Sequence, residues 1–268
     1  MYADFYSLAE EPFNVTPDPR FLLMTEQHET ALNHLLYGIT QRKGFVLLTG
    51  EVGTGKTTIC RKLLGCLDPR FRTALILNPV LSPTQLLRAI VQEFGLSVRR
   101  AERLACLGQL NAFLLETAGA GGDAVLVIDE AQDMSDELLE VARLLSNLET
   151  DSRKLLQIVL VGQPELREKL RQPHLRQLQQ RITVRYHLRP MTLEETALYL
   201  RHRLGVAGGQ AIEFDEQAVA EIHRQSGGTP RLINALGDKA LLAGYVHQSR
   251  RITGDLVALA VQELREAA

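Results

Sequence analysis

Eight consecutive residues in the first quarter of the sequence have the composition of a phosphate-binding loop. The run GEVGTGKT at positions 50–57 matches the pattern GxxxxGK[ST] at each fixed position. It follows a short apolar run and precedes a helical pattern, which is the setting that such a loop needs. Glycine permits the backbone curl that points several N–H groups at phosphate oxygens, and the N-terminus of the following helix favours negative charge.

This loop predicts a binding site for ATP and Mg²⁺. We expect Lys56 to reach the β- and γ-phosphates and to act in catalysis, and the hydroxyl of Thr57 to be a ligand of Mg²⁺. The nucleotide-binding residues predicted from the loop are Gly50, Glu51, Val52, Gly53, Thr54, Gly55, Lys56, Thr57 and Thr58.

Two adjacent carboxylates follow the apolar run 125–128. Asp129, at the end of a buried strand, can hold the Mg²⁺ shell through water. Glu130 has the position to orient or deprotonate the attacking water. An acidic pair at a strand end is also a common helix cap, but its pairing with the phosphate loop favours hydrolysis over a nucleotide-operated switch.

Two polar residues elsewhere could detect the phosphates. Gln163 is the last residue of the stretch IVLVGQ (158–163) that ends the fourth predicted strand, where a polar side chain could respond to the γ-phosphate; the alternative is a turn residue before Pro164. Arg231 lies in the first turn of a predicted helix, where a cation is unfavourable for the helix dipole. An ATP phosphate would offset that cost, so we predict that Arg231 binds nucleotide; the alternative is a solvent-facing arginine.

Two arginines precede the last predicted strand and could act on a neighbouring subunit. Arg176 and Arg181 are both candidates for stabilising transition-state charge on a neighbour's ATP. The sequence does not choose between them, and the alternative for each is a solvated helix arginine.

Short apolar runs alternate with helical patterns along most of the chain. This alternation predicts an α/β fold with a five-stranded parallel sheet covered on both faces. The strands are expected at 45–49, 73–77, 124–128, 156–161 and 183–188. Helices are expected before and between them, at 27–42, 56–67, 84–94, 102–117 and 136–147, followed by a helical stretch near 164–180 that is interrupted at Pro173.

Only helical periods follow residue 192, at 193–204, 215–225, 230–247 and 253–264. We therefore predict an N-terminal arm and helix (1–43), an α/β core (44–190) and a small all-helical lid domain (191–268). The first 25 residues hold three prolines and three phenylalanines, which predicts an extended arm that packs its aromatic side chains on a neighbour or partner.

Composition excludes several classes of protein. The net charge is −2 with 45% hydrophobic residues, so neither nucleic acid nor anionic lipid is favoured as a partner of the whole chain. The three cysteines form no CxxC pair, and the histidines form no metal-binding pattern. With no signal-peptide pattern and no apolar run of spanning length, we expect a cytoplasmic protein without direct membrane insertion.

Taken together, these motifs resemble an AAA+ ATPase with its helical lid, and more specifically the general secretion pathway protein A (ExeA/GspA) family. The stretches that resemble this family are FY at 5–6, PF at 12–13, TPDPRF at 16–21, GFVLLTGEVGTGKT at 44–57, DEAQ at 129–132, LLSNL at 144–148, GQPEL at 162–166 and SGGTPRLIN at 226–234. The N-terminal stretches, GQPEL and SGGTPRLIN are the more specific ones, because the phosphate-binding parts are shared by all AAA+ proteins.

The resemblance covers nearly the whole chain and implies an oligomeric ATPase that forms a ring or an ATP-dependent assembly. It further implies a partner in the inner membrane and a role in assembling a secretion, pilus or export system of the bacterial envelope. Longer family members continue into a transmembrane segment and a peptidoglycan-binding part. We therefore expect a short form or an isolated ATPase domain, without direct peptidoglycan binding.

Two other functions stay open. The first is a regulator of DNA transposition that shares the same core. It is favoured by the pairs Arg99-Arg100 and Arg250-Arg251 and by a basic stretch that contains Arg167, Lys169, Arg171, Arg176, Arg181, Arg185 and Arg189. The negative net charge and the lack of a helix-turn-helix motif oppose it, so DNA is not the expected partner. The second is an ATP-gated adaptor with little turnover.

Overall fold

The computed structural model describes residues 2–14, 18–98, 102–150 and 153–266. Its contacts divide the chain into two compact units. The first unit, here called the helical unit, consists of Met1–Thr25, Glu51–Thr58 and Arg189–Ala268. The second, here called the sheet unit, consists of Glu26–Gly50 and Ile59–Leu188. The phosphate-loop residues therefore group with the C-terminal helices, although the strand before them belongs to the sheet.

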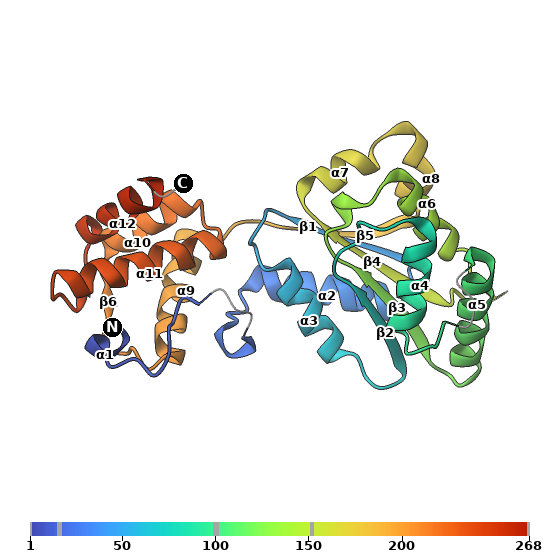
Figure 1. The fold of residues 1–268 in the computed structure, drawn as a ribbon, viewed down its shortest axis with the longest axis horizontal. Coiled ribbons are helices and arrows are strands. Elements are labelled where there is room, and N and C mark those ends of the chain that lie inside the picture. The colour runs from blue at the N-terminus through green and yellow to red at the C-terminus, as the bar shows by residue number, and fades with distance from the viewer. Residues whose placement is uncertain (1, 15–17, 99–101, 151–152, 267–268) are drawn as a thin grey trace. The chain divides into compact units, whose positions relative to one another are not determined.

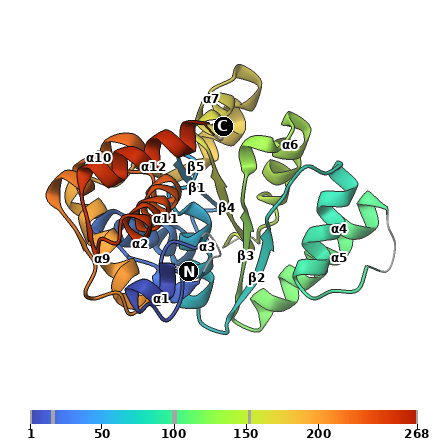
Figure 2. The ribbon, with the colours of Figure 1, turned by 60° about the vertical axis from the view of Figure 1, so that its left-hand side comes forward.

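The sheet unit contains five parallel strands in the order β2-β3-β4-β1-β5 (Figure 1). This confirms the five-stranded parallel sheet expected from the sequence. Figure 2 shows β2 and β3 side by side, with α4 and α5 beside them. The strands are β1 (Phe45–Gly50), β2 (Phe71–Ile76), β3 (Asp123–Ile128), β4 (Leu156–Gly162) and β5 (Ile182–Leu188).

Helices cover both faces of this sheet. They are α2 (Glu26–Thr40), α3 (Lys56–Cys66), α4 (Pro83–Glu93), α5 (Arg103–Gly119), α6 (Asp136–Leu145), α7 (Pro164–Leu170) and α8 (Arg176–Arg181), with short 3₁₀ turns η2 (Ala131–Asp133) and η3 (Pro173–Leu175). Five of the expected helices correspond to α2, α3, α4, α5 and α6. The interruption expected at Pro173 is confirmed, because η3 begins at Pro173 and separates α7 from α8.

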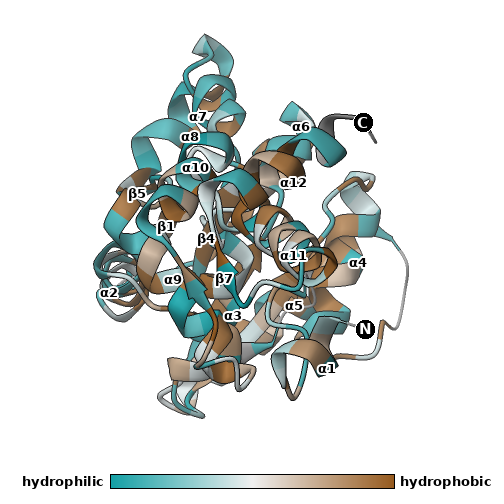
Figure 3. Ribbon diagram, turned by 90° about the vertical axis from the view of Figure 1, so that its left-hand side faces the viewer, coloured by the Kyte–Doolittle hydropathy of each residue, from teal (hydrophilic) through white to brown (hydrophobic). Residues whose placement is uncertain are grey.

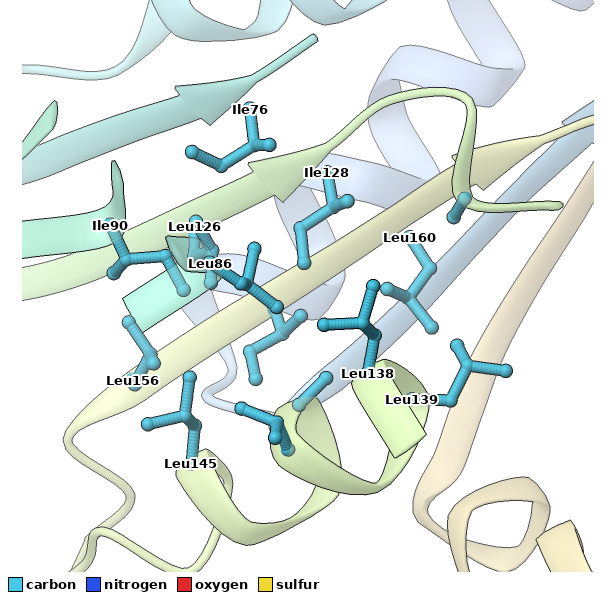
Figure 4. Close-up of a cluster of buried hydrophobic side chains, with 14 of the residues drawn as sticks. Ile76, Leu86, Ile90, Leu126, Ile128, Leu138, Leu139, Leu145, Leu156 and Leu160 are labelled. Carbon is cyan, nitrogen blue, oxygen red and sulfur yellow. The ribbon is translucent and has the colours of Figure 1, made fainter. Parts of the chain in front are cut away.

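Strand side chains alternate between two apolar cores. On β3, Leu126 and Ile128 face a core shared with α4 and α6, whereas Val125 and Val127 face a core shared with α2. Figure 4 shows the first core, with leucines of α6 pointing at β3 and β4. In Figure 3 the ribbon of α7 and α8 is mostly hydrophilic, and β5 has both hydrophobic and hydrophilic segments. Because both faces of the three central strands are buried, β1, β3 and β4 are nearly continuous apolar runs.

The helical unit is built from four longer helices and the N-terminal segment. Its elements are α1 (Tyr2–Tyr6), η1 (Pro19–Phe21), α9 (Leu193–Val206), α10 (Glu216–Ser226), α11 (Pro230–Val246), α12 (Gly254–Glu266) and the strands β6 (Glu213–Phe214) and β7 (Arg251–Ile252). Thr192 and Glu195 form the capping box that starts α9. The prediction of helices alone missed β6 and β7, because two residues are too few to show a strand period.

The N-terminal segment differs from the expected extended arm, and its prediction was wrong in two respects. Residues 2–6 form a helix, and the aromatic side chains of Tyr6 and Phe13 pack in the core of this chain's own helical unit instead of on a neighbour. The Tyr6 hydroxyl donates to the carbonyl oxygens of Leu241 and Ser249, at 3.1 and 3.0 Å. Thr16 and Pro17 of the TPDPRF stretch lie outside the described residues.

Arg203 of α9 also binds the N-terminal segment. Its guanidinium donates to the backbone carbonyls of Pro12 and Asn14 and lies over the ring of Phe21. The side chain is buried, so these carbonyls replace the water that the cation would otherwise bind. Among the described residues, no helix has both the length and the apolar composition required to cross a bilayer.

Candidate nucleotide-binding site

The phosphate loop is a tight curl that ends at the start of α3. Gly53 and Gly55 have φ angles of +79° and +95°, a region that side chains with a Cβ rarely adopt. The backbone N–H and the hydroxyl of Thr54 both donate to the carbonyl of Glu51, and the Lys56 ammonium donates to the same oxygen at 2.9 Å. Lys56 is therefore held over its own loop, where its charge faces backbone dipoles.

Arg231 lies against this loop within the helical unit. A Cβ built on Gly53 would lie 2.6 Å from the Cβ of Arg231 and 3.2 Å from the Cγ2 of Thr229. Arg231 is exposed and follows Pro230, the first residue of α11. The structure thus brings the predicted arginine next to the predicted loop. Its contact with a phosphate stays a prediction.

The acidic pair begins where β3 ends. Asp129 is 2% exposed, and its backbone N–H continues the sheet by donating to Ile76. The backbone N–H of Glu130 donates to the Asp129 carboxylate at 2.9 Å. Glu130 has φ +50° and ψ +37°, a left-handed conformation that costs a non-glycine residue about 1 kcal/mol or more. This local turn directs the chain away from the sheet edge directly after the two carboxylates.

Glu130 and Gln163 meet through a third residue that the sequence analysis did not assign to the site. The Gln132 amide donates to Glu130 Oε2 at 2.7 Å, and its oxygen accepts the backbone N–H of Gln163 at 3.0 Å. The Gln163 side chain also donates to Glu130 Oε2, at 3.4 Å. The sequence shows Gln132 two residues after Glu130, but no local pattern indicated that its side chain contacts both Glu130 and Gln163.

Sheet topology places these groups at one edge. β3 is paired with β4 and β4 with β1, so residues after β3 and β4 and the start of the phosphate loop follow neighbouring carboxyl ends. In open parallel sheets, ligands bind outside the carboxyl ends of the strands. Asp129, Gln163 and Gly50 are thus at the edge where such sheets bind ligands.

The two candidate trans-acting arginines differ in their surroundings. The Arg181 guanidinium donates to the Ser146 hydroxyl at 2.8 Å and to the Asn147 side chain, both just after α6. Arg176 is exposed at the start of α8, and its side chain has no hydrogen bond or ion pair within the part of the chain that the structure describes.

The residues present fit ATP and Mg²⁺. At Gly53 the curl leaves no room for a Cβ, so the backbone itself lines the loop. A threonine hydroxyl and a carboxylate, from Thr57 and Asp129, are the hard oxygen donors that Mg²⁺ prefers. Mg²⁺ is usually held by one or two protein oxygens together with substrate phosphates and water, so donors of these two types suit it chemically.

Four features together define a P-loop protein of the AAA+ class. They are a phosphate loop after β1, an acidic pair after β3, a polar residue after β4 and a set of C-terminal helices packed with the loop. Residues 39–170 match the family model described as an AAA domain. The chain is 49% identical to general secretion pathway protein A of Aeromonas hydrophila over 265 residues, which is 98% of this chain and 48% of the relative. The chain belongs to the AAA+ proteins related to general secretion pathway protein A, and it spans about half the length of that relative.

Solved structures share the fold at low sequence identity. The Aeropyrum pernix ORC2 protein in its ADPNP–ADP complexes superposes with a TM-score of 0.69 at 17% identity, over 95% of this chain and 72% of that chain. Drosophila ORC bound to DNA gives 0.71 at 21% identity, over 97% and 66%. The Thermotoga maritima RuvB branch migration motor gives 0.59 at 21% identity, over 90% and 69%. At these identities the likeness concerns the fold alone.

Proposed function

We propose that this protein binds Mg-ATP and hydrolyses it to ADP and phosphate. The observation that carries the proposal is the hydrogen-bonded pair of Glu130 and Gln163, which lies at the sheet edge where the phosphate loop begins. A protein that only binds nucleotide needs the loop, but it does not need a carboxylate held at one oxygen beside a polar residue at the next strand end.

Each residue then has a role in the proposed reaction. Lys56 leaves the Glu51 carbonyl to bind the β- and γ-phosphates, and Arg231 approaches them from α11. Thr57 and, through water, Asp129 would hold Mg²⁺, which would supply positive charge to offset that of the phosphates. Glu130 accepts the proton of the attacking water, and Gln163 links that carboxylate to the γ-phosphate position.

Steady-state phosphate release tests this proposal. The wild-type protein should turn over ATP with Mg²⁺ and stop when Mg²⁺ is removed. Lys56→Ala should lose turnover, whereas Lys62→Ala, an exposed lysine on the same helix, should behave as wild type. Wild-type protein that binds Mg-ATP without releasing phosphate would instead support an ATP-gated adaptor.

We propose a homo-oligomer in which Arg176 acts on the ATP of a neighbouring subunit. The support is that Arg181 is bound to its own chain, whereas Arg176 is exposed and unengaged among the described residues. Analytical ultracentrifugation of Glu130→Gln with Mg-ATP should show a larger species than the protein without nucleotide. A monomer under both conditions would exclude this arrangement.

The pathway is proposed from the relative, because that protein is named for general secretion. We propose that the chain works at the cytoplasmic face of the inner membrane with a membrane protein partner. There it would power or regulate assembly of an envelope secretion, pilus or export system. Capture from solubilised inner membranes should retain a specific partner on ATP-loaded Glu130→Gln and lose it on Lys56→Ala. Equal recovery of the partner on both variants would show that its binding does not depend on ATP.

One observation favours the DNA alternative. Arg167, Arg171 and Arg185 line a single cavity of about 280 Å³ in the sheet unit. Arg99 and Arg100, which also suggested DNA, lie outside the described residues. Binding of labelled duplex DNA with ATP should be absent even at low salt under our proposal; salt-sensitive binding that Arg167→Ala weakens would support DNA instead.

A further inference from the structure

Gln132 is fixed at both ends of its side-chain amide. The nitrogen donates to Glu130 Oε2 at 2.7 Å, and the oxygen accepts the backbone N–H of Gln163 at 3.0 Å. There is no space between this amide and the end of β4, because a Cβ on Gly162 would lie 2.8 Å from Gln132 Oε1. The amide therefore spans the gap between the ends of two neighbouring strands.

The backbone of Gln132 is fixed as well. The Lys169 ammonium donates to the carbonyls of Gln132 and Met134, at 2.7 Å each. Lys169 belongs to α7, which starts at Pro164 directly after Gln163. The segment that carries Glu130 is thus hydrogen-bonded to Gln163, which directly follows β4, and to α7. A shift of β4 and α7 would therefore also move this segment.

The contacts on the Glu130 carboxylate are one-sided. Both glutamine amides donate to Oε2, and within the described residues no hydrogen bond is recorded for Oε1. An oxygen that receives two N–H groups is a weaker proton acceptor than its neighbour. Holding one oxygen also restricts rotation of the carboxylate, so the other oxygen is presented in one direction.

We infer that Gln132 is a positioning residue for hydrolysis: it ties Oε2 of Glu130 to the backbone of Gln163, so that the base and the strand end that follows β4 move together. This inference rests on the proposed ATPase function. Gln132 acts through Glu130, whose Oε1 takes the proton of the attacking water. Among the described residues, the charged groups hydrogen-bonded to Gln132 are Glu130 and Asp133 on its own segment and Lys169 of α7.

Two substitutions separate positioning from folding. Gln132→Met keeps the length of the side chain and removes both hydrogen bonds, so kcat should fall about 10- to 100-fold while KM for ATP changes less than about twofold. Gln132→Glu keeps an acceptor for the Gln163 N–H but turns a carboxylate toward Glu130. The matched control is Gln172→Glu, which makes the same change at an exposed position.

The pH profile of kcat gives the discriminating readout. Two carboxylates that share a site hold a proton to higher pH, so the rise of kcat with pH should move upward by about 1 unit or more in Gln132→Glu and stay in place in Gln172→Glu. A residue with a structural role alone would lower kcat at all pH values without moving the profile.

Each outcome decides the inference. Normal kcat in both Gln132 variants, with active wild-type protein, would overturn it while leaving the proposed function intact. A lowered kcat with an unmoved profile in Gln132→Glu would also overturn it, as would a loss of turnover that only follows a fall in melting temperature. Wild-type protein without phosphate release would overturn the proposed function and this inference together.

Discussion

Gly53 of the phosphate loop lies directly against Arg231 at the start of α11, because a Cβ on Gly53 would be 2.6 Å from the Cβ of that arginine. The two residues belong to the same compact unit, so the loop is packed with the C-terminal helices. This contact supports the proposal that Arg231 binds a nucleotide held by the loop. The contact also gives Gly53 a second reason to be glycine besides its positive φ angle.

We predict that Gly53→Ala impairs nucleotide binding more than its backbone strain explains. Gly95 is the matched control, because its φ of +77° equals that of Gly53 within two degrees and its Cβ would meet nothing within 4 Å. Both alanine variants should lose about 1–2 kcal/mol of stability from the left-handed conformation. Only Gly53→Ala should also weaken binding of a fluorescent ATP analogue, by about tenfold or more.

Thermal unfolding and a binding titration on the two variants check this. Equal affinity for the analogue in both variants would contradict a close contact between the loop and α11.

We predict that Arg176 and Arg181 give opposite phenotypes. Arg181→Ala removes hydrogen bonds to Ser146 and Asn147, so it should lower the free energy of unfolding by about 1 kcal/mol while the folded protein keeps most of its turnover. Arg176→Ala should leave the melting temperature unchanged and lower turnover by about 10³-fold or more.

A mixing experiment establishes whether Arg176 acts between subunits. Arg176→Ala and Lys56→Ala are each inactive alone, but a mixture forms interfaces that have an intact loop on one side and Arg176 on the other. Partial recovery of phosphate release is expected. No recovery at any mixing ratio, from proteins that still assemble, would place Arg176 outside a neighbour's site.

We predict an alkaline loss of stability that depends on Tyr6. Burial raises the pKa of Tyr6 to about 12, and its hydroxyl donates to two backbone carbonyls. Because the folded-state pKa lies above the unfolded value of about 10, the stabilisation is complete below pH 10 and disappears as pH rises through 12. Tyr6→Phe should be less stable than wild type by about 1 kcal/mol at neutral pH.

Denaturant unfolding at several pH values measures this difference. The gap between wild type and Tyr6→Phe should narrow above pH 10. A stability difference that stays constant to pH 12 would mean that the hydrogen bonds from the Tyr6 hydroxyl to the Leu241 and Ser249 carbonyls do not supply this stabilisation.

The sequence predicted the parts of the molecule whose signals are local. The five strands, the phosphate loop and the acidic pair each show in a short window, because a buried strand is apolar and a phosphate loop needs glycine at fixed positions. The role of Gln132 could not be predicted, because its contacts join two strand ends that are distant in sequence. The packing of Tyr6 and Phe13 depends on α11 in the same way, and proline content alone wrongly suggested an extended arm.

The choice between Arg176 and Arg181 also required the structure. Both arginines lie before β5 with similar neighbours in the sequence. Only the position of Ser146 and Asn147 after α6 shows that one guanidinium is already bound within its own chain.

The central claim is that Glu130 activates water for ATP hydrolysis, and single-turnover phosphate release from Glu130→Gln tests it most directly. The control is Glu137→Gln, an exposed glutamate on α6. The account predicts that Glu130→Gln binds Mg-ATP as wild type does and hydrolyses it at least about 100-fold more slowly, while Glu137→Gln matches wild type in both respects. Wild-type hydrolysis by Glu130→Gln would contradict it.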